Sequence, residues 1–460
     1  MRKVGVVKNR DVRSEPRASF FRKLGDSWCF FLVAALALTT LACSAPGTKY
    51  AALRDAVERT RFIDVHAHPS LAHIDYPAGD RYPTLEPPIS RPYWVAPEGR
   101  VAVFDALQVR GLRTVYGYTR PAVTEADLPE LKKLSEEFWQ EGRRAGLNKV
   151  LDRCGIERVF YNAGSRKDDL DPERTAWVPF IDSYLSPFPA PNMKGVSPEF
   201  REWLASSASE AAERAKAAGR PFDDLPSYLA FVDAALTTLS EEGAVALKLG
   251  VAYTRTLWFD DPDEAEVRSL FAAGLEGRTT DWPSYKKVQD FVARHIFLKA
   301  GELGLPVHVH TGFGADAGLR NLDSSALNLE SVLSDIRFKE TRFLILHASY
   351  PFADKLKPLL EKRNVFVDFS AVNWMVVEEE LGRILEDWFL YPGATEKVMF
   401  GSDAGAPVLF WVAARNSRDA LYRALAALVD RGRLTEDGAV RVAEKVMRTN
   451  ALRLHEFGGR

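Results

Sequence analysis

Two histidines near the start of the chain have a spacing that suits metal binding. They end the hydrophobic run 62–68 (FIDVHAH), as His66 and His68. Side chains two residues apart on an extended backbone point to the same face. The two imidazoles can therefore share one metal ion, and the alternative is that two histidines occur there by chance.

Three later hydrophobic runs end in residues of the same chemical kind. The run 306–310 (PVHVH) alternates valine with histidine, 343–347 (FLILH) ends in a histidine, and 398–403 (VMFGSD) ends in an aspartate. Neutral imidazoles and a carboxylate are suitable ligands for a divalent ion such as zinc. We therefore expect one metal site, with one or two ions, to be formed by His66, His68, His347, Asp403 and a histidine of the run 306–310, where both His308 and His310 are candidates.

Lys248 interrupts another hydrophobic run, 244–250 (AVALKLG), at a position that faces the same way as Ala246. A buried ammonium group beside a divalent cation is strongly disfavoured. We expect Lys248 to be neutral, to be carboxylated, or to reach solvent at the rim. Asp368 is expected either to support the ligands or to anchor a loop, and Asp64 to be structural.

Such strand ends meet only if the strands are parallel and share one sheet. From Arg61 onward, short β-branched runs alternate with longer helical patterns, which is typical of β/α units. The expected strands are 61–66, 156–162, 175–182, 244–249, 306–310, 342–347, 364–369 and 397–402. Each is expected to precede a helical segment, which predicts an α/β fold, a (β/α)8 TIM barrel. A doubly wound sheet is the alternative, but no glycine-rich phosphate turn follows the first strand.

Two long insertions interrupt this pattern, after strand 1 near residues 70–150 and after strand 3 near residues 183–242. Loops that follow barrel strands stand over the site, so both insertions are expected to form its walls and cap. We expect residues 61–460 to form one capped barrel domain, preceded by a linker and first helix over 43–60.

The N-terminal residues 1–42 have the pattern of an export signal. A basic segment precedes the uncharged run 28–42 and the small residues around Cys43. Cys43 stands where a bacterial lipoprotein carries its lipid, which predicts an exported protein, periplasmic or membrane-anchored. The alternatives are an uncleaved anchor formed by 28–42 and a buried N-terminal helix.

The overall composition excludes several classes of partner. The chain has 61 Lys and Arg against 63 Asp and Glu, which gives no reason to expect binding to nucleic acid. No apolar stretch reaches the ~18 residues that a spanning helix needs, so the membrane is expected only as the target of a lipid anchor. A small molecule is the expected partner, and the sequence leaves the oligomeric state open.

The positions of these residues resemble a known family. His66-x-His68, Lys248, His310, His347 and Asp403 occupy the first, fourth, fifth, sixth and eighth strand ends of the metal-dependent amidohydrolase superfamily. The chain looks most like the amidohydrolase-related family, including the amidohydrolase half of fusion proteins that end in a glutamine-synthetase-like domain. The similar segments are 310–314 (HTGFG), 346–352 (LHASYPF), 252–255 (AYTR), 400–404 (FGSDA) and 450–454 (NALRL). His308 is an additional histidine beside His310, and the family position favours His310 as the ligand.

The resemblance implies an enzyme, a metal-dependent hydrolase that cleaves an amide C–N bond. Asp403, His347 and Lys248 are the expected catalytic residues, with Lys248 also able to bridge two ions if it is carboxylated. Asp403 is expected to take a proton from water and to pass it to the leaving nitrogen. The rivals are a non-oxidative decarboxylase on the same scaffold and a non-catalytic binding lipoprotein.

Three residues near the ligands are expected to contact the substrate: Arg255, Tyr253 and Thr311. The guanidinium of Arg255 offers a planar fork for a carboxylate, which suggests an acidic substrate. The alternative is a surface arginine paired with Asp260 or Asp261.

Overall fold

The computed structural model describes residues 49–69, 105–191, 198–278, 281–314 and 319–455. The export signal, Cys43 and residues 70–104 of the first insertion lie outside these ranges, so the expectations that rest on them stay predictions. Residues 48–460 form one compact unit, which is described here.

Eight parallel strands lie within the described residues, in chain order. They are β1 (Phe62–Ala67), β2 (Ile156–Asn162), β3 (Thr175–Val178), β4 (Leu247–Leu249), β5 (Val307–Val309), β6 (Phe343–Ile345), β7 (Val365–Asp368) and β8 (Val398–Met399). One sheet has the order β1-β2-β3 and the other β4-β5-β6-β7-β8. All eight fall inside the expected ranges or within one residue of them.

Backbone hydrogen bonds connect the two sheets at both edges. On one side, the N–H of Val65 in β1 donates to the carbonyl of Phe400 at 3.1 Å. On the other, parallel bridges join Trp177 to Ala244 and Phe180 to Lys248. Eight parallel strands in this order are the arrangement of a (β/α)8 barrel, which confirms the predicted fold class.

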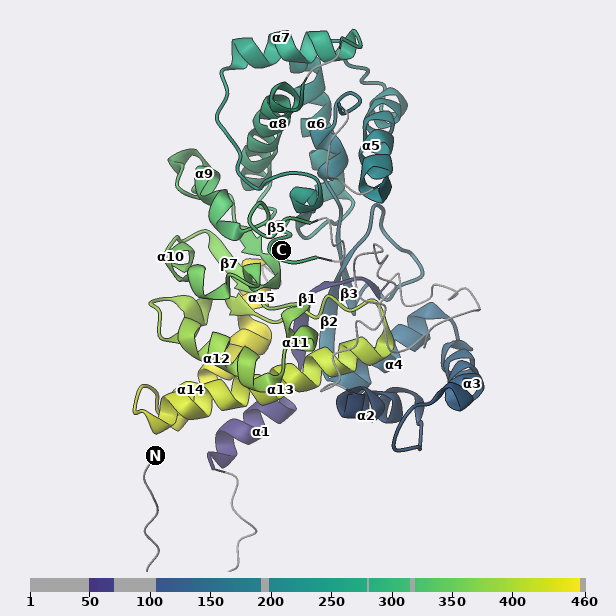
Figure 1. Ribbon diagram of the computed structural model, residues 1–460, viewed down its shortest axis with the longest axis vertical. Coiled ribbons are helices and arrows are strands. Elements are labelled where there is room, and N and C mark those ends of the chain that lie inside the picture. The colour runs from purple at the N-terminus through teal and green to yellow at the C-terminus, as the bar shows by residue number, and fades with distance from the viewer. Residues whose placement is uncertain (1–48, 70–104, 192–197, 279–280, 315–318, 456–460) are drawn as a thin grey trace, which may run out of the picture. The chain divides into compact units, whose positions relative to one another are not determined.

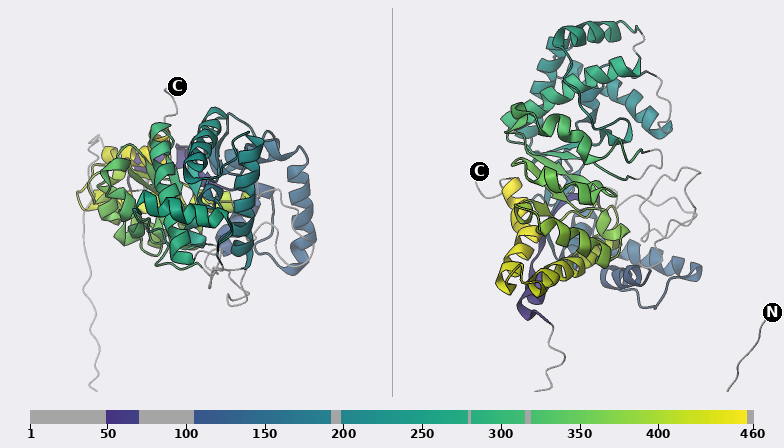
Figure 2. Two further views of the ribbon diagram at one scale, coloured as in Figure 1. Left: turned by 90° about the horizontal axis from the view of Figure 1, so that it is seen from above. Right: turned by 60° about the vertical axis from the view of Figure 1, so that its left-hand side comes forward.

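Most connections between strands contain helices. Their bounds are α1 (Ala51–Arg59), α2 (Asp105–Tyr116), α3 (Leu128–Trp139), α4 (Arg143–Cys154), α5 (Pro198–Ala217), α6 (Leu225–Glu241), α7 (Glu264–Leu275), α8 (Trp282–Glu302), α9 (Glu330–Leu333), α10 (Lys357–Leu360), α11 (Val372–Met375), α12 (Glu378–Phe389), α13 (Pro407–Asp430), α14 (Glu436–Glu444) and α15 (Asn450–Leu454). Helices α2 to α4 follow β1, and α5 and α6 follow β3, where the two insertions were expected. Within this unit, α5 to α8 gather at one end, whereas α1, α13 and α14 lie together at the other (Figures 1 and 2).

One connection differs from the expectation of a helix after every strand. Residues 163–174, all of which the structure describes, join β2 to β3 without a helix. The six strands from β3 to β8 are also shorter than predicted. Strand β3 ends at Val178 because Pro179 has no N–H to continue the ladder.

The strands separate two hydrophobic layers, as the alternation of their residues predicts. Leu247 and Leu249 of β4 and both valines of β5 pack in the large cluster between strands and helices. Ala246, with side chains such as Ile63 and Phe160, belongs to the smaller cluster inside the barrel. The residues between these hydrophobic positions are the ones that carry the polar site.

Candidate metal centre

His66 and His68, at the end of β1, both contact the carboxylate of Asp403. The distances from His66 Nε2 and His68 Nε2 to Asp403 Oδ1 are 2.9 and 3.1 Å. The N–H of Asp403 donates to the carbonyl of His66 at 2.7 Å, so the backbones of the two strand ends are also joined. The structure thus brings together the first and last of the expected ligands.

His347 and His310 lie beside this group. His347 Nε2 is 3.0 Å from His310 Nδ1, and His347 Nδ1 is 4.0 Å from Asp403 Oδ2. Potential ligand atoms of His66, His347 and Asp403 all lie within 4.8 Å of one another. The five expected ligands therefore form one contiguous cluster at the carboxyl ends of β1, β5, β6 and β8.

Two side chains of the cluster are partly exposed among the described residues. The side chains of His66 and His347 are each 1% exposed, whereas those of His68 and Asp403 are 25% and 22% exposed. A small molecule can reach Asp403 and His68, but the other histidines are enclosed by protein.

Lys248 lies inside the barrel, 3% exposed, and its Nζ has no hydrogen-bond partner among the described residues. Burial lowers the pKa of Lys248 to about 8, although the negative charges of Asp403, Asp368 and Asp182 oppose this shift. The alternative of a lysine that reaches solvent at the rim is therefore wrong. A divalent ion bound nearby would lower this pKa further, so a neutral lysine and a carboxylated one are the two remaining alternatives.

Two buried aspartates hold the backbone of the ligand segments. Asp368 Oδ1 accepts the N–H of His347 at 2.7 Å and the hydroxyl of Ser370 at 2.9 Å. Asp64 Oδ1 accepts the N–H of Ser402 at 2.8 Å, next to Asp403. Asp368 therefore supports a ligand directly, and Asp64 has the structural role that the sequence predicts.

Asp182 is a third buried aspartate, which sequence reasoning missed. Its Oδ1 accepts the N–H of Gly250 at 2.6 Å, two residues after Lys248. The signal was present, since Asp182 ends the expected strand 175–182 just as Asp403 ends the last one. Burial raises the pKa of Asp182 to about 7, and it likewise raises those of Asp368 and Asp64, to about 7 and about 8.

The protonation states of the cluster suit metal coordination. Burial lowers the pKa of His66 and His310 well below the usual value and that of His347 to about 4. Burial acts to raise the pKa of Asp403, but His66 and His347 hold it well below its usual range. Neutral imidazoles beside an anionic carboxylate are the forms that bind a divalent ion. Buried nitrogen atoms without a partner, His310 Nε2 and Lys248 Nζ, are further donors available there.

The structure separates the two histidines of β5. His308 Nε2 lies 2.9 Å from the Nε2 of His455, whose Nδ1 is 2.7 Å from the carbonyl of Ala451. His308 thus joins β5 to the C-terminal helix α15, whereas His310 reaches His347. His455, which the sequence left unassigned, is the partner of His308.

Of the three expected substrate residues, Tyr253 packs against the ring of a cluster histidine. Its ring is 4.5 Å from the ring of His310, centre to centre, and it is partly exposed. Thr311 is buried, and its hydroxyl donates to the carbonyl of Leu346 at 2.6 Å. Thr311 therefore connects the ends of β5 and β6 and is not placed to contact a substrate.

Arg255 requires a correction. Its guanidinium is fully buried and forms an ion pair with Asp290, which is also fully buried. It further donates to the carbonyls of Thr256 and Trp258, both at 3.0 Å. Because these protein groups occupy the guanidinium, the expected role in reading a substrate carboxylate is wrong, as is the alternative of a surface ion pair.

Comparisons with known proteins agree with this site and fold. The amidohydrolase family model matches residues 202–457, more than half of the chain, and the chain belongs to this family. Protein fluG of Emericella nidulans is 26% identical over 230 residues, which cover 48% of this chain. That match spans only 26% of the fluG protein, so its whole activity does not transfer to this chain.

Solved structures show the same fold at low sequence identity. Uronate isomerase of Thermotoga maritima has a TM-score of 0.65 and 12% identity, covering 88% of this chain and 97% of that one. A candidate metal-dependent hydrolase of Lactobacillus casei has a TM-score of 0.59 and 14% identity, with coverage of 88% and 97%. Glucuronate isomerase of Caulobacter crescentus has a TM-score of 0.57 and 13% identity, with coverage of 91% and 96%. These similarities establish the fold alone. The metal follows from the family match, because members of the amidohydrolase superfamily bind a divalent metal.

Proposed function

We propose that the chain is a metal-dependent hydrolase that cleaves the C–N bond of a small amide. The observation that carries this proposal is the contact of Asp403 Oδ1 with both His66 and His68. Asp403 and His68 are the partly exposed members of a cluster whose other histidines are buried. Proton transfer beside a divalent ion requires an anionic carboxylate that a substrate can reach. The neutral imidazoles around Asp403 are suitable ligands for such an ion.

The residues of the cluster would serve as metal ligands, and Asp403 would also serve as the base. His66, His68 and Asp403 would hold an ion, with His310 and His347 completing that site or holding a second one. Nitrogen and carboxylate donors of this kind favour zinc. Such an ion, when bound, lowers the pKa of water toward ~7 and polarises a substrate carbonyl.

The protein itself supplies proton transfer and positioning. Asp403 Oδ2, on the side of His347, accepts a proton from the attacking water and passes it to the leaving nitrogen. Ser370 fixes His347 through a contact of 2.9 Å between its hydroxyl and Nδ1, while Nε2 faces His310. Tyr253 forms part of the wall beside His310. The guanidinium of Arg255 is paired with Asp290 inside the protein, so it does not bind a carboxylate of the substrate.

Product analysis tests this proposal directly. Metal-loaded protein is incubated with a panel of N-acyl and γ-glutamyl amides, and the products are identified by mass spectrometry. Hydrolysis releases the acid and the amine in equal amounts. Release of carbon dioxide from aromatic acids without amide cleavage would instead establish a decarboxylase, and a lack of turnover with metal bound would favour a binding protein.

A further inference from the structure

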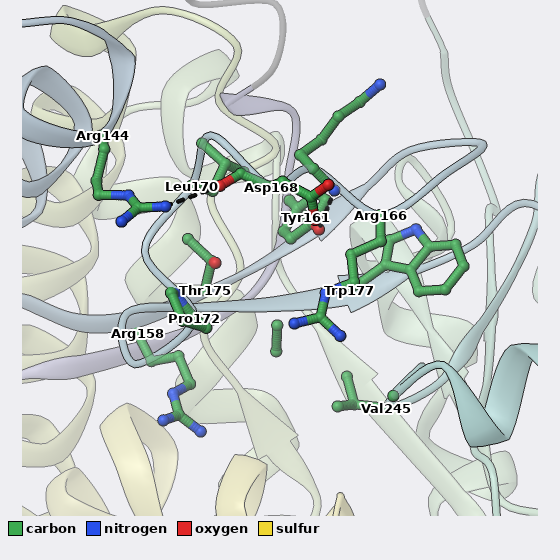
Figure 3. Close-up of a pocket in the computed structure, with 13 residues that line it drawn as sticks. Arg144, Arg158, Tyr161, Arg166, Asp168, Leu170, Pro172, Thr175, Trp177 and Val245 are labelled. Atoms are coloured by element: carbon green, nitrogen blue, oxygen red, sulfur yellow. Dashed lines mark hydrogen bonds between the residues drawn. The ribbon is translucent and has the colours of Figure 1, made fainter.

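A pocket of about 260 Å³ opens beside the connection that lacks a helix. In a (β/α)8 barrel, the helix after each strand covers the outer face of the sheet. Residues 163–174 replace that helix between β2 and β3. The pocket lies between this segment, helix α4 and the start of β4 (Figure 3). None of its lining residues belongs to the candidate metal centre.

The floor of the pocket is fixed by hydrogen bonds within the protein. The indole N–H of Trp177 donates to the carbonyl of Ala163 at 2.9 Å, and the hydroxyl of Tyr161 accepts the N–H of Lys167 at 3.0 Å. Trp177 and Tyr161 are 4% and 2% exposed. With their polar atoms used in this way, both residues offer apolar ring atoms to the pocket, and its shape is set without a ligand.

Positive charge dominates the wall of this pocket. Four cationic side chains line it against one carboxylate, that of Asp168: Arg144, Arg158, Arg166 and Lys167. In Figure 3, Arg144 and Arg158 lie on one side of the pocket, and Arg166 lies on the other side with Trp177.

Two of these arginines are held by neutral acceptors. Arg144 donates to the carbonyl of Asp168 at 2.8 Å, and Arg166 donates to the carbonyl of Glu242 at 3.2 Å. Neither forms an ion pair with any carboxylate in the described ranges. Each guanidinium is therefore oriented by a neutral acceptor and not by an ion pair, which leaves N–H groups for an anion.

We propose that this pocket binds a small organic anion, a carboxylate or a phosphate ester. Arg144 and Arg166 bind the oxygen atoms of the anion, and the body of the ligand packs against Trp177 and Val245. A guanidinium matches the planar spacing of two carboxylate or phosphate oxygens, and the volume suits only a small molecule. Since Trp177 bridges to Ala244, the ligand contacts both sides of the junction between the two sheets.

Calorimetric titration of the metal-loaded protein tests this inference, with inorganic phosphate and benzoate as separate probes. We expect saturable millimolar or tighter binding of at least one probe, and a comparison of the two distinguishes a phosphate from a carboxylate site. Arg144→Ala and Arg166→Ala should each weaken binding about tenfold, equivalent to ~1.4 kcal/mol. Arg214→Ala, which removes an exposed arginine of α5 paired with Glu210, is the matched control.

Binding at the metal centre must be separated from binding in the pocket. The titration is therefore repeated with His66→Ala, which should retain the affinity of the unmodified protein. Three results would each overturn the proposal. They are loss of binding in His66→Ala, an affinity of both arginine variants equal to that of the unmodified protein, and no saturable binding of either probe.

Discussion

Backbone strain is concentrated at the residues of the candidate metal centre. Asp403 and His347 have positive φ angles of 56° and 61°, in the left-handed region that residues other than glycine rarely adopt. Hydrogen bonds hold both of them there, from the N–H of Asp403 to His66 and from the N–H of His347 to Asp368. Such strain persists where the surroundings over-determine it, and it is common at functional sites.

The chemical state of Lys248 gives a test of how many ions the centre holds. Only a carboxylated lysine supplies two anionic oxygens that can bridge two ions. If Lys248 is carboxylated, Lys248→Ala should lower the metal content from two ions per chain to one or fewer. Added bicarbonate during expression should raise the occupancy of the unmodified protein. Equal metal content in both proteins, measured by plasma mass spectrometry, would indicate a single-ion centre in which Lys248 has another role.

The burial of Arg255 makes a prediction about stability. Arg255→Ala leaves Asp290 without its fully buried partner, and removal of one member of such a pair lowers the free energy of unfolding by about 3 kcal/mol. Lys286, which also contacts Asp290 at 2.6 Å, limits the loss. Urea denaturation measures the change.

The matched control is Arg268→Ala on α7. Arg268 pairs with Glu264 on the exposed surface, so its loss should change the free energy of unfolding by only about 0.3–0.5 kcal/mol. Unchanged stability in Arg255→Ala, together with a selective loss of activity on carboxylate substrates, would restore the role that the sequence suggested.

At the scale of elements, the strands and their polar ends were predictable from local pattern. Because side chains alternate between the two faces of a strand, the sequence placed Lys248 and His310 inside the barrel. Because the strands are parallel, the carboxyl ends of distant strands such as β1 and β8 lie together. The missing helix after β2 was not expected, although Gly164, Ser165 and Pro172 of that segment are typical of a loop. The partners of Arg255 and His308 lie 35 and 147 residues away, where no local pattern identifies them.

The contact between His308 and His455 joins the C-terminal helix to the barrel and predicts a pH-dependent stability. Burial lowers the pKa of His455 from 6.5 to about 3. Between these values the unfolded chain binds the proton and the folded chain does not, so stability falls as the pH decreases through this window. The contribution is fully present above pH 6.5.

His455→Phe tests this contribution because it keeps an aromatic ring and removes the titrating group. Its unfolding free energy should be about 1–3 kcal/mol lower at pH 7.5, where His308 loses its partner. Between pH 6.5 and pH 4 its stability should depend less on pH than that of the unmodified protein. An identical pH slope for both proteins would contradict the assignment.

At the scale of the whole molecule, the family match covers residues 202–457 and the compact unit covers residues 48–460, so the first residues pose a separate question. No helix among the described residues is long and apolar enough to span a membrane. From the sequence of residues 1–43, we propose that the protein is exported and carries a lipid on Cys43. From the balance of charges in the whole chain, we propose that its partner is a small molecule and not nucleic acid.

Cell fractionation tests the lipid anchor. Cys43→Ser should move the protein from the membrane fraction to the soluble exported fraction without loss of activity, since the barrel begins only at β1. Membrane association that persists in Cys43→Ser would indicate an uncleaved anchor over residues 28–42. A soluble, unexported protein in both cases would contradict export itself.

The central claim is that the strand-end histidines and Asp403 hold a divalent ion on which activity depends. Metal content and amide hydrolysis are measured together on the unmodified protein, His66→Ala, Asp403→Asn and a control, His295→Ala, whose histidine pairs with Asp233 on α6. We expect the unmodified protein and the control to retain metal and activity, and both ligand variants to lose metal and activity together. Full activity in metal-free His66→Ala would contradict the account.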